Sequence, residues 1–321
     1  MVFPVSGVEV NPLLPPLIAL VVSTFTSMGG VSGAFLLLPF QVSILGFTSP
    51  AVSPTNLVFN IVAIPSGVYR YLREGRMNWP LTWVVILGTL PGLLFGALIR
   101  VSWLPDPRNF KLFVGCVLLY IGLWLLYDQT PWAKRKKARI QEFEARVQER
   151  LAAVLKEAGY PAGKGLPPAA RVKTASWSLK QVSYEFLGET FSFSAPALFA
   201  LALVVGLIGG TYGIGGGAII APFLAAVFQL PIYTIAGAAL MATFLTSVAG
   251  VGIYYCLAPF CPGQMVAPDL ALGALFGIGG FLGMYAGARL QKFFSAIAIR
   301  IGLGLIISAL ALRYIVGFFA G

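Results

Sequence analysis

Two glycine-rich stretches interrupt the most apolar parts of the chain. The first, TSMGGVSGAFLLLPF, covers Thr26–Phe40, and the second, GTYGIGGGAIIAPF, covers Gly210–Phe223. A helix that restarts after a break presents unpaired backbone N–H groups, and its dipole places partial positive charge at the same point. Such helix starts bind anions, and glycine lets a ligand approach the backbone closely. The two stretches therefore predict a binding site for a small anion.

Hydroxyl and amide side chains gather in these stretches and in the apolar segments that follow them. The same spans contain no acidic residue, which argues against a cation site and against proton coupling through a carboxylate. Each hydroxyl taken singly also fits a residue that bonds the backbone of its own helix. The candidate substrate-binding residues are Ser27, Gly29, Gly30, Ser32, Gly33, Asn56, Asn60, Thr211, Tyr212, Gly213, Gly215, Gly216, Gly217, Thr243, Thr246 and Ser247.

Glycine in a membrane helix has a second interpretation, which is close packing between helices. We prefer that interpretation for the pairs Gly92/Gly96 and Gly283/Gly287, which stand in uninterrupted apolar segments. For the two broken segments we prefer a ligand site, because polar side chains accompany the glycines there.

The composition places the chain in a membrane. Of its 321 residues, 58% are hydrophobic and 10% are charged, and the mean hydropathy is +0.86. Soluble domains carry about 25% charged residues. Residues 11–69 and 195–268 contain no charge, and each stretch is long enough for more than one span of about 20 residues. We therefore expect an all-α integral membrane protein.

The apolar segments form two similar blocks, residues 11–127 and 195–320, around a polar insert at residues 128–194. Each block reads as one broken segment followed by three helices. Pro39-Phe40 lines up with Pro222-Phe223, and the two glycine pairs named above line up in the same order. This ordered series of matches predicts an internal duplication. Shared glycine bias in two apolar stretches is the alternative.

The distribution of basic residues predicts how the two blocks are oriented. If each broken segment forms a hairpin that enters and returns, each block crosses the membrane an odd number of times and the repeats are inverted. The loops YRYLREGRMN and RLQKFF then join the insert on the cytoplasmic side, as the positive-inside rule requires. Both chain termini become periplasmic. Arg100, Arg108 and Lys111 run against this assignment, because they fall near the outer face.

The insert has a different chemistry from the two blocks. Its basic start, Lys134–Arg139, is expected to lie against anionic lipid headgroups, and the residues that follow read as a charged amphipathic helix. Alternating polar and apolar residues around Leu187-Gly188 predict a β-hairpin. The insert is thus a cytoplasmic α+β appendage. It has no aromatic-interleaved basic motif that would indicate nucleic-acid binding.

The chain lacks the residues that most catalytic and metal sites need. It has no histidine, and buried carboxylates are few, so we expect no enzymatic activity, no metal and no cofactor. Cys256 and Cys261 would face the periplasm, where either a disulfide or two free thiols is compatible with their spacing. The oligomeric state is not fixed by these features, and a homodimer is open.

The motifs GGVSGAFLLLPF and YGIGGGAIIAPF, each followed by a helix that opens near a proline, resemble those of the TauE/SafE family of sulfite and organosulfonate permeases. The resemblance covers both apolar blocks. It implies transport of sulfite, an organosulfonate or a related small anion across the bacterial inner membrane. A passive anion channel and a carrier of small carboxylates are the alternatives. Ser32-Gly33-Ala34 departs from Gly215-Gly216-Gly217, and the long insert looks unusual for the family.

Overall fold

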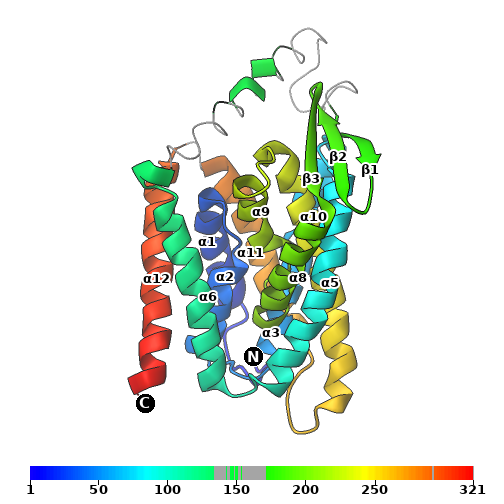
Figure 1. Cartoon of the computed structure of the whole chain (residues 1–321). Helices are drawn as coiled ribbons and strands as arrows, with labels where there is room; N and C mark the ends of the chain where they lie inside the picture. The colour runs from blue at the N-terminus through cyan, green and yellow to red at the C-terminus, as the bar shows by residue number, and fades with distance from the viewer. Residues whose placement is uncertain are drawn as a thin grey trace.

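The computed structural model describes residues 1–133, 142, 145–147, 149–150, 153, 171–290 and 293–320. Nearly all of the described chain is helical, and a small sheet lies at one end of the helical bundle (Figure 1). Within this part of the chain, six helices are long and apolar enough to cross a membrane, and four shorter apolar helices accompany them. The prediction of a multi-pass, mostly helical membrane protein is therefore confirmed.

The helices follow the order that the apolar pattern predicts. The first block holds α1 (Leu14–Gly29), α2 (Ala34–Ser43), α3 (Val52–Ala63), α4 (Pro65–Arg73), α5 (Trp79–Ser102) and α6 (Pro107–Tyr127). The second block holds α8 (Ala195–Tyr212), α9 (Gly217–Ala226), α10 (Ile232–Leu257), the short 3-10 helix η2 (Ala258–Phe260), α11 (Leu270–Leu290) and α12 (Ala296–Ala320).

The first of the three helices that the sequence predicts after the broken segment of block one, over residues 50–71, is divided in the structure. The chain forms α3 and α4, which share Ile64 as the residue between them. Pro65 stands at the first position of α4. A proline has no N–H to donate to the preceding turn, and its ring disfavours a continuous helix, so the segment breaks at this point.

Each glycine-rich stretch is a helix, a short non-helical link and a second helix. In the first, α1 has 16 residues and α2 has 10, and in the second, α8 has 18 and α9 has 10. At 1.5 Å per residue the first arms are about 24–27 Å long and the returning arms about 15 Å. The arms of each hairpin are therefore unequal.

The glycine pairs outside the breaks stand at close helix contacts, as predicted. A Cβ added at Gly92 of α5 would lie 2.1 Å from the carbonyl oxygen of Leu203 on α8. A Cβ added at Gly283 of α11 would lie 2.4 Å from the carbonyl oxygen of Leu20 on α1. The first arm of each hairpin thus packs against a long helix of the other block, α1 against α11 and α8 against α5, with backbones in direct contact.

Two other helix pairs join equivalent segments of the blocks and run antiparallel. Gly115 of α6 faces Ala311 of α12, whereas Gly122 faces Gly304, so the residue numbers run in opposite directions along the pair. On α3 and α4 the same holds against α10, because Gly250 faces Leu57 whereas Gly67 faces Leu240. Figure 1 places both chain termini toward the end of the bundle opposite the sheet.

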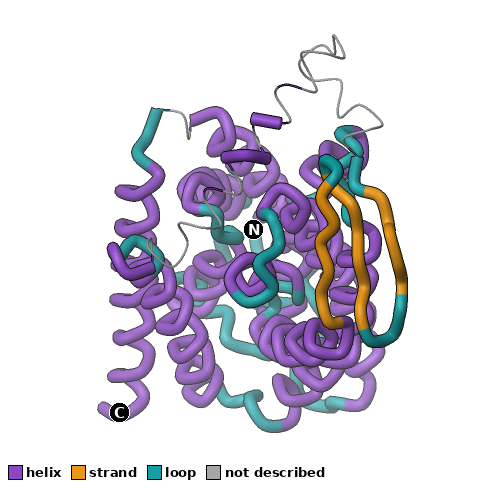
Figure 2. Tube along the Cα trace, turned by 45° about the horizontal axis from the view of Figure 1, so that its top comes forward, coloured by secondary structure: helices purple, strands orange, loops and turns teal. Residues whose placement is uncertain are grey.

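The β-hairpin predicted around Leu187-Gly188 is present as part of a three-stranded antiparallel sheet among the described residues. Its strands are β1 (Lys173–Trp177), β2 (Gln181–Phe186) and β3 (Glu189–Ser194), in the order β1-β2-β3. Figure 2 shows them side by side at one edge of the helices. Lys134–Arg139 lies outside the described residues, as does most of the amphipathic segment that follows it.

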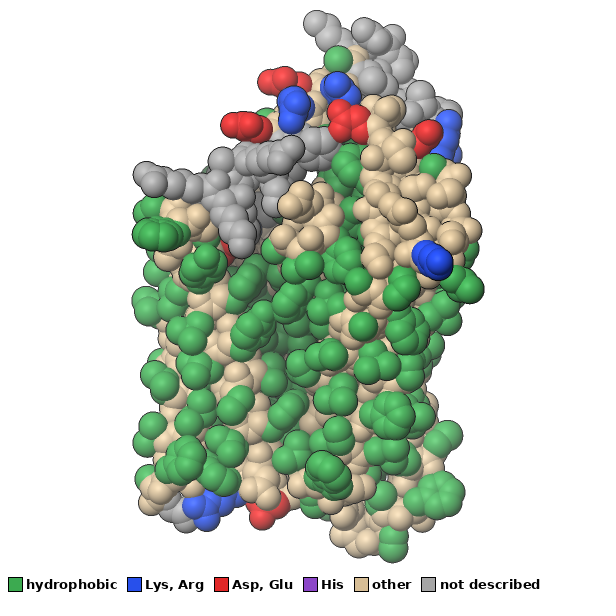
Figure 3. Space-filling view, viewed as in Figure 1, with side chains coloured by type: hydrophobic (Ala, Val, Ile, Leu, Met, Phe, Trp, Pro, Cys, Tyr) green, Lys and Arg blue, Asp and Glu red, His purple; other side chains and the backbone are tan. Residues whose placement is uncertain are grey.

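The sheet packs on the helices through buried aromatic side chains. The Tyr184 hydroxyl lies 2.8 Å from the Thr234 hydroxyl near the start of α10, and the Phe186 ring stacks on that of Tyr233 with 5.5 Å between centroids. Tyr184 and Phe186 are buried. This end of the bundle is called the insert end below. In Figure 3 charged side chains gather there, whereas hydrophobic side chains cover the middle of the visible face.

Candidate functional site

Both helix breaks begin at a glycine with a left-handed backbone. Gly30 has φ +76°, and Gly213 has φ +89°, a conformation that costs other residues free energy. The N–H of Gly213 donates to the carbonyl of Gly209 at 2.8 Å, and that of Gly30 donates to the carbonyl of Ser27 at 3.2 Å. The two helices therefore end in the same way, which the repeated motif predicts.

Asn56 of α3 joins the two breaks. Its Nδ2 donates to the carbonyl of Ala34 at 3.1 Å and to the carbonyl of Gly213 at 3.0 Å. Its Oδ1 accepts from Gln41 Nε2 at 3.3 Å, and the Asn56 side chain is fully buried. One side chain thus holds the start of α2 and the end of α8 together, so the two breaks lie next to each other.

Further side chains hold the second break from two sides. Asn60 Nδ2 donates to the carbonyl of Ile214 at 2.9 Å, and Ser53 Oγ donates to the carbonyl of Thr211 at 2.9 Å. From α10, Thr246 Oγ1 accepts from the N–H of Gly216 at 3.2 Å. The non-helical backbone is satisfied by protein groups, as it must be inside a membrane.

The glycines of the second break lie against other parts of the protein. A Cβ added at Gly213 would lie 2.2 Å from the Ser53 carbonyl oxygen, and one at Gly217 would lie 2.1 Å from that of Ala239. At Gly216 it would meet Thr89 Cγ2 at 2.5 Å. At Gly30, in the first break, the nearest atom is Arg300 Nη2 at 3.9 Å. Gly30 therefore has more space beside it.

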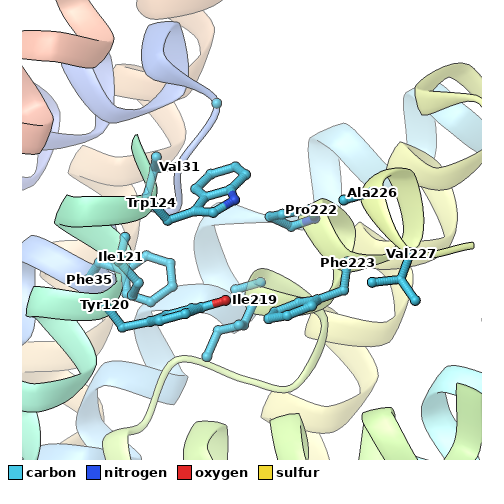
Figure 4. Close-up of a pocket in the computed structure, with 12 residues that line it drawn as sticks. Val31, Phe35, Tyr120, Ile121, Trp124, Ile219, Pro222, Phe223, Ala226 and Val227 are labelled. Carbon is cyan, nitrogen blue, oxygen red and sulfur yellow. The ribbon is translucent and has the colours of Figure 1, made fainter. Parts of the chain in front are cut away.

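A cavity of about 200 Å³ lies beside the first break, between α6 and α9 (Figure 4). The first break contributes Gly30 and Val31, and the first turns of the two returning helices contribute Phe35, Ala218 and Ile219. The rest of the lining consists of Tyr120, Ile121 and Trp124 of α6, together with Pro222, Phe223, Ala226 and Val227. The starts of α2 and α9 therefore border one space.

Aromatic rings form the walls of this cavity. Tyr120 and Phe223 face each other with parallel rings 6.3 Å apart, and Trp124 lies opposite Pro222 (Figure 4). Phe35 also packs edge-on against Tyr212 at 6.2 Å, and the Tyr212 hydroxyl donates to the Phe35 carbonyl at 2.8 Å. The lining is thus mostly apolar and suits the carbon portion of a ligand.

The place related to this cavity by the repeat is occupied by side chains. There α12 passes α2, and the Tyr314 hydroxyl lies 2.5 Å from Ser43 Oγ and donates to the Pro39 carbonyl at 3.2 Å. Pro39 is the counterpart of Pro222, which lines the cavity. The two halves of the protein are therefore alike in fold but differ in whether this position is open.

The predicted site residues have different surroundings in the structure. Gly30 borders the cavity. The hydroxyls of Ser27, Thr243 and Thr246 bond carbonyls of their own helices, which is the alternative that the sequence left open. The other members lie in or around the two breaks: Gly29, Ser32, Gly33, Asn56, Asn60, Thr211, Tyr212, Gly213, Gly215, Gly216, Gly217 and Ser247.

Two aromatic residues of the cavity lining were missed from the sequence. Tyr120 and Trp124 stand in α6, far along the chain from either glycine motif, and an aromatic residue in an apolar helix carries no signal of its own. Arg300 of α12 and Asp128 at the end of α6 form an ion pair, with Nη1 3.5 Å from Oδ2. In the sequence, Arg300 is one of three basic residues near membrane ends, with Arg70 and Lys111, that could attract an anion, although an anchor at the membrane surface is the default interpretation.

No cluster of three potential metal ligands occurs among the described residues. In the same part of the chain, Cys116, Cys256 and Cys261 are free thiols.

Comparison with known proteins agrees with the glycine motifs. The family described as Sulfite exporter TauE/SafE matches residues 16–314. A protein of Bacillus subtilis (strain 168), named as the probable membrane transporter protein YunE, is 24% identical over 223 residues, which is 67% of each chain. No solved structure matches. Because the family match extends over both apolar blocks, this chain belongs to the TauE/SafE family of membrane transporters.

Proposed function

We propose that this transporter carries a small anion, sulfite or an organosulfonate, across the bacterial inner membrane by alternating access. The observation that carries the proposal is the cavity bordered by the first break and by the first turns of α2 and α9. Helix starts favour negative charge, and the lining has no carboxylate that would repel it. The family description and the apolar walls support an anion with a sulfur oxyanion group.

Residues 11–127 and 195–320 form inverted repeats in this proposal. The antiparallel packing of α6 on α12, and of α3 and α4 on α10, supports a two-fold relation with its axis in the membrane plane. Gly67 meets Leu240 as Gly250 meets Leu57. Gly67 and Gly250 are 183 positions apart, as are Leu57 and Leu240, and the same 183 positions separate Gly30 from Gly213. The two hairpins then enter from opposite faces.

The insert end is the cytoplasmic end, and both termini are periplasmic. Arg70, Arg73 and Arg76 lie at the end of α4 near the sheet, which agrees with the positive-inside rule. Two of the three residues that oppose this orientation, Arg100 and Arg108, have structural partners at the far end. Arg100 donates to the carbonyls of Leu104 and Ser49, and Arg108 donates to that of Phe318. These contacts explain why the far end tolerates two arginines.

The difference between the two halves supports alternating access. The cavity extends to Ala226 and Val227, at the end of α9 nearest the insert, so this state receives its substrate from the cytoplasm. Tyr314 closes the related position between α2 and α12 on the periplasmic side. In an outward-facing state the cavity beside α9 would be closed, and the related position between α2 and α12 would be open. The buried polar residues around the breaks, among them Asn56 and Ser247, then form the midpoint of the transport path in both states.

The test is flux of radiolabelled sulfite into proteoliposomes that contain the full chain. We expect uptake that saturates with concentration and that is stimulated by unlabelled sulfite or an organosulfonate on the opposite side. Empty liposomes are the control for leakage of the labelled anion. Current that rises linearly with voltage and does not saturate would instead identify a passive anion channel. Counter-transport by acetate or malonate alone would identify a carboxylate carrier.

A further inference from the structure

We propose that Arg300 is the residue that receives the negatively charged group of the transported anion, and that Asp128 occupies its guanidinium when no anion is bound. This inference rests on the proposed function and identifies a charged partner within the same site. It differs from the site expected from the sequence, which was composed of neutral groups alone.

Arg300 is placed at the edge of the cavity by its contact with the first break. Its Nη2 lies 3.9 Å from the position of a Cβ at Gly30, a glycine that lines the cavity. One turn further along α12, Leu303 packs against Gly29, and this contact fixes the helix against the end of α1. The guanidinium therefore stands beside the helix break and not at a remote membrane surface.

The ion pair with Asp128 does not engage every N–H donor of the Arg300 guanidinium. Nη1 lies 3.5 Å from Asp128 Oδ2, which is longer than the about 2.7–2.9 Å of a charge-assisted hydrogen bond. Its Nε is buried and has no hydrogen-bond partner among the residues that the structure describes. A buried donor without a partner costs free energy, and a carboxylate or sulfonate would satisfy it through two parallel bonds. The arrangement suits an exchange of partners.

The side chain is accessible enough for such an exchange. Arg300 has 40% of its side chain exposed, whereas Asp128 has 10% exposed. An arginine that serves only as an anchor at the membrane surface would direct its charge toward lipid headgroups. Arg300 instead faces another helix and the first break. The aromatic walls of the cavity, which Gly30 also lines, can accept the carbon portion of an organic anion.

The test is binding of sulfite and of 1-propanesulfonate to the purified full chain, measured by titration calorimetry in detergent. Arg300→Gln is expected to weaken binding by about tenfold or more, because a charge-assisted pair is lost. Asp128→Asn is expected to tighten binding by about two- to fivefold, because the competing carboxylate is removed. Arg313→Gln is the matched control, since Arg313 lies exposed on the same helix, and its binding should equal that of the wild type.

The opposite signs of the two effects distinguish this role from a structural ion pair. If Asp128→Asn weakens binding as Arg300→Gln does, the pair only holds the fold and the inference is wrong. Arg300→Gln binding equal to Arg313→Gln binding would also overturn it, while the proposed function would stand. If Arg300→Gln does not fold, the sign of the Asp128→Asn effect still decides. A wild-type protein that binds neither anion would reject the proposed function itself.

Discussion

Gly92 of α5 faces the carbonyl oxygen of Leu203 on α8, and Gly283 of α11 makes the equivalent contact with Leu20 on α1. Gly30 lies instead at a cavity edge, where an added Cβ would have its nearest atom, Arg300 Nη2, at 3.9 Å. These glycines are indistinguishable by composition, and only their setting in a broken or an unbroken helix separates them in the sequence. That setting assigned the packing role to the Gly92 and Gly283 pairs, and the structure confirms that assignment.

Gly92→Ala should therefore destabilise the protein. The added methyl group would lie 2.1 Å from the Leu203 carbonyl oxygen, so α5 and α8 would have to separate. Overpacking of this kind costs about 1–3 kcal/mol. Thermal unfolding in detergent measures the loss, with Gly252→Ala as the control, because a Cβ at Gly252 has no atom within 4 Å. Equal melting temperatures for the two variants would show that the close contact is not needed.

Asn56 shows how much of a single residue's role can be predicted from the sequence. Its type and its position after the first glycine motif marked it as a site candidate. Its two acceptors, the carbonyls of Ala34 and Gly213, are 22 and 157 positions away along the chain. Which carbonyls a buried amide bonds depends on packing between distant helices, and no local pattern encodes it. For the same reason the aromatic lining from α6 could not be predicted.

At the scale of single elements, the returning helices α2 and α9 are the parts suited to move. Each has 10 residues and begins after a glycine link, whereas the first arms pack along full-length partners. Both helices contain an internal proline, Pro39 and Pro222, which removes one backbone hydrogen bond from each. Short helices with few internal bonds open at low free-energy cost.

Tyr314→Phe should increase the mobility of α2 while leaving the rest of the bundle unchanged. The variant loses the hydroxyl that contacts Ser43 Oγ and the Pro39 carbonyl, and these bonds hold α2 to α12. Hydrogen exchange followed by mass spectrometry should show faster exchange of the amides in residues 34–43. Tyr285→Phe serves as the control, because the Tyr285 side chain is exposed. Unchanged exchange of α2 would mean that Tyr314 does not close this side.

The insert shows how far element prediction extends outside the membrane. The turn at Leu187-Gly188 and the alternation around it identified the hairpin, because a tight turn and a two-residue period are local signals. The third strand and the docking of Tyr184 and Phe186 on α10 were not predicted. The insert was interpreted as an appendage, yet its sheet contacts the helix that follows the second hairpin.

For the whole molecule, the ordered glycine and proline matches predicted two similar blocks, and the family match covers both. Charge asymmetry then predicted the relative orientation, which the antiparallel contacts between equivalent helices support. What the sequence does not contain is the difference between the halves. The cavity at Phe223 is open, whereas the matched position at Tyr314 is closed. The two blocks have the same sequence pattern at these positions, so the pattern does not predict which one is open.

The most direct test of inverted repeats and alternating access compares the matched positions Phe223 and Phe40. In a chain whose three cysteines are replaced by serine, Phe223→Cys and Phe40→Cys would be labelled with a membrane-impermeant thiol reagent from each side of sealed vesicles. We predict that Phe223→Cys reacts from the cytoplasmic side and that Phe40→Cys reacts, more slowly, from the periplasmic side. Adding Tyr314→Phe should speed labelling at Phe40→Cys and slow it at Phe223→Cys. Labelling of both positions from the same side, or rates that rise together, would contradict the account.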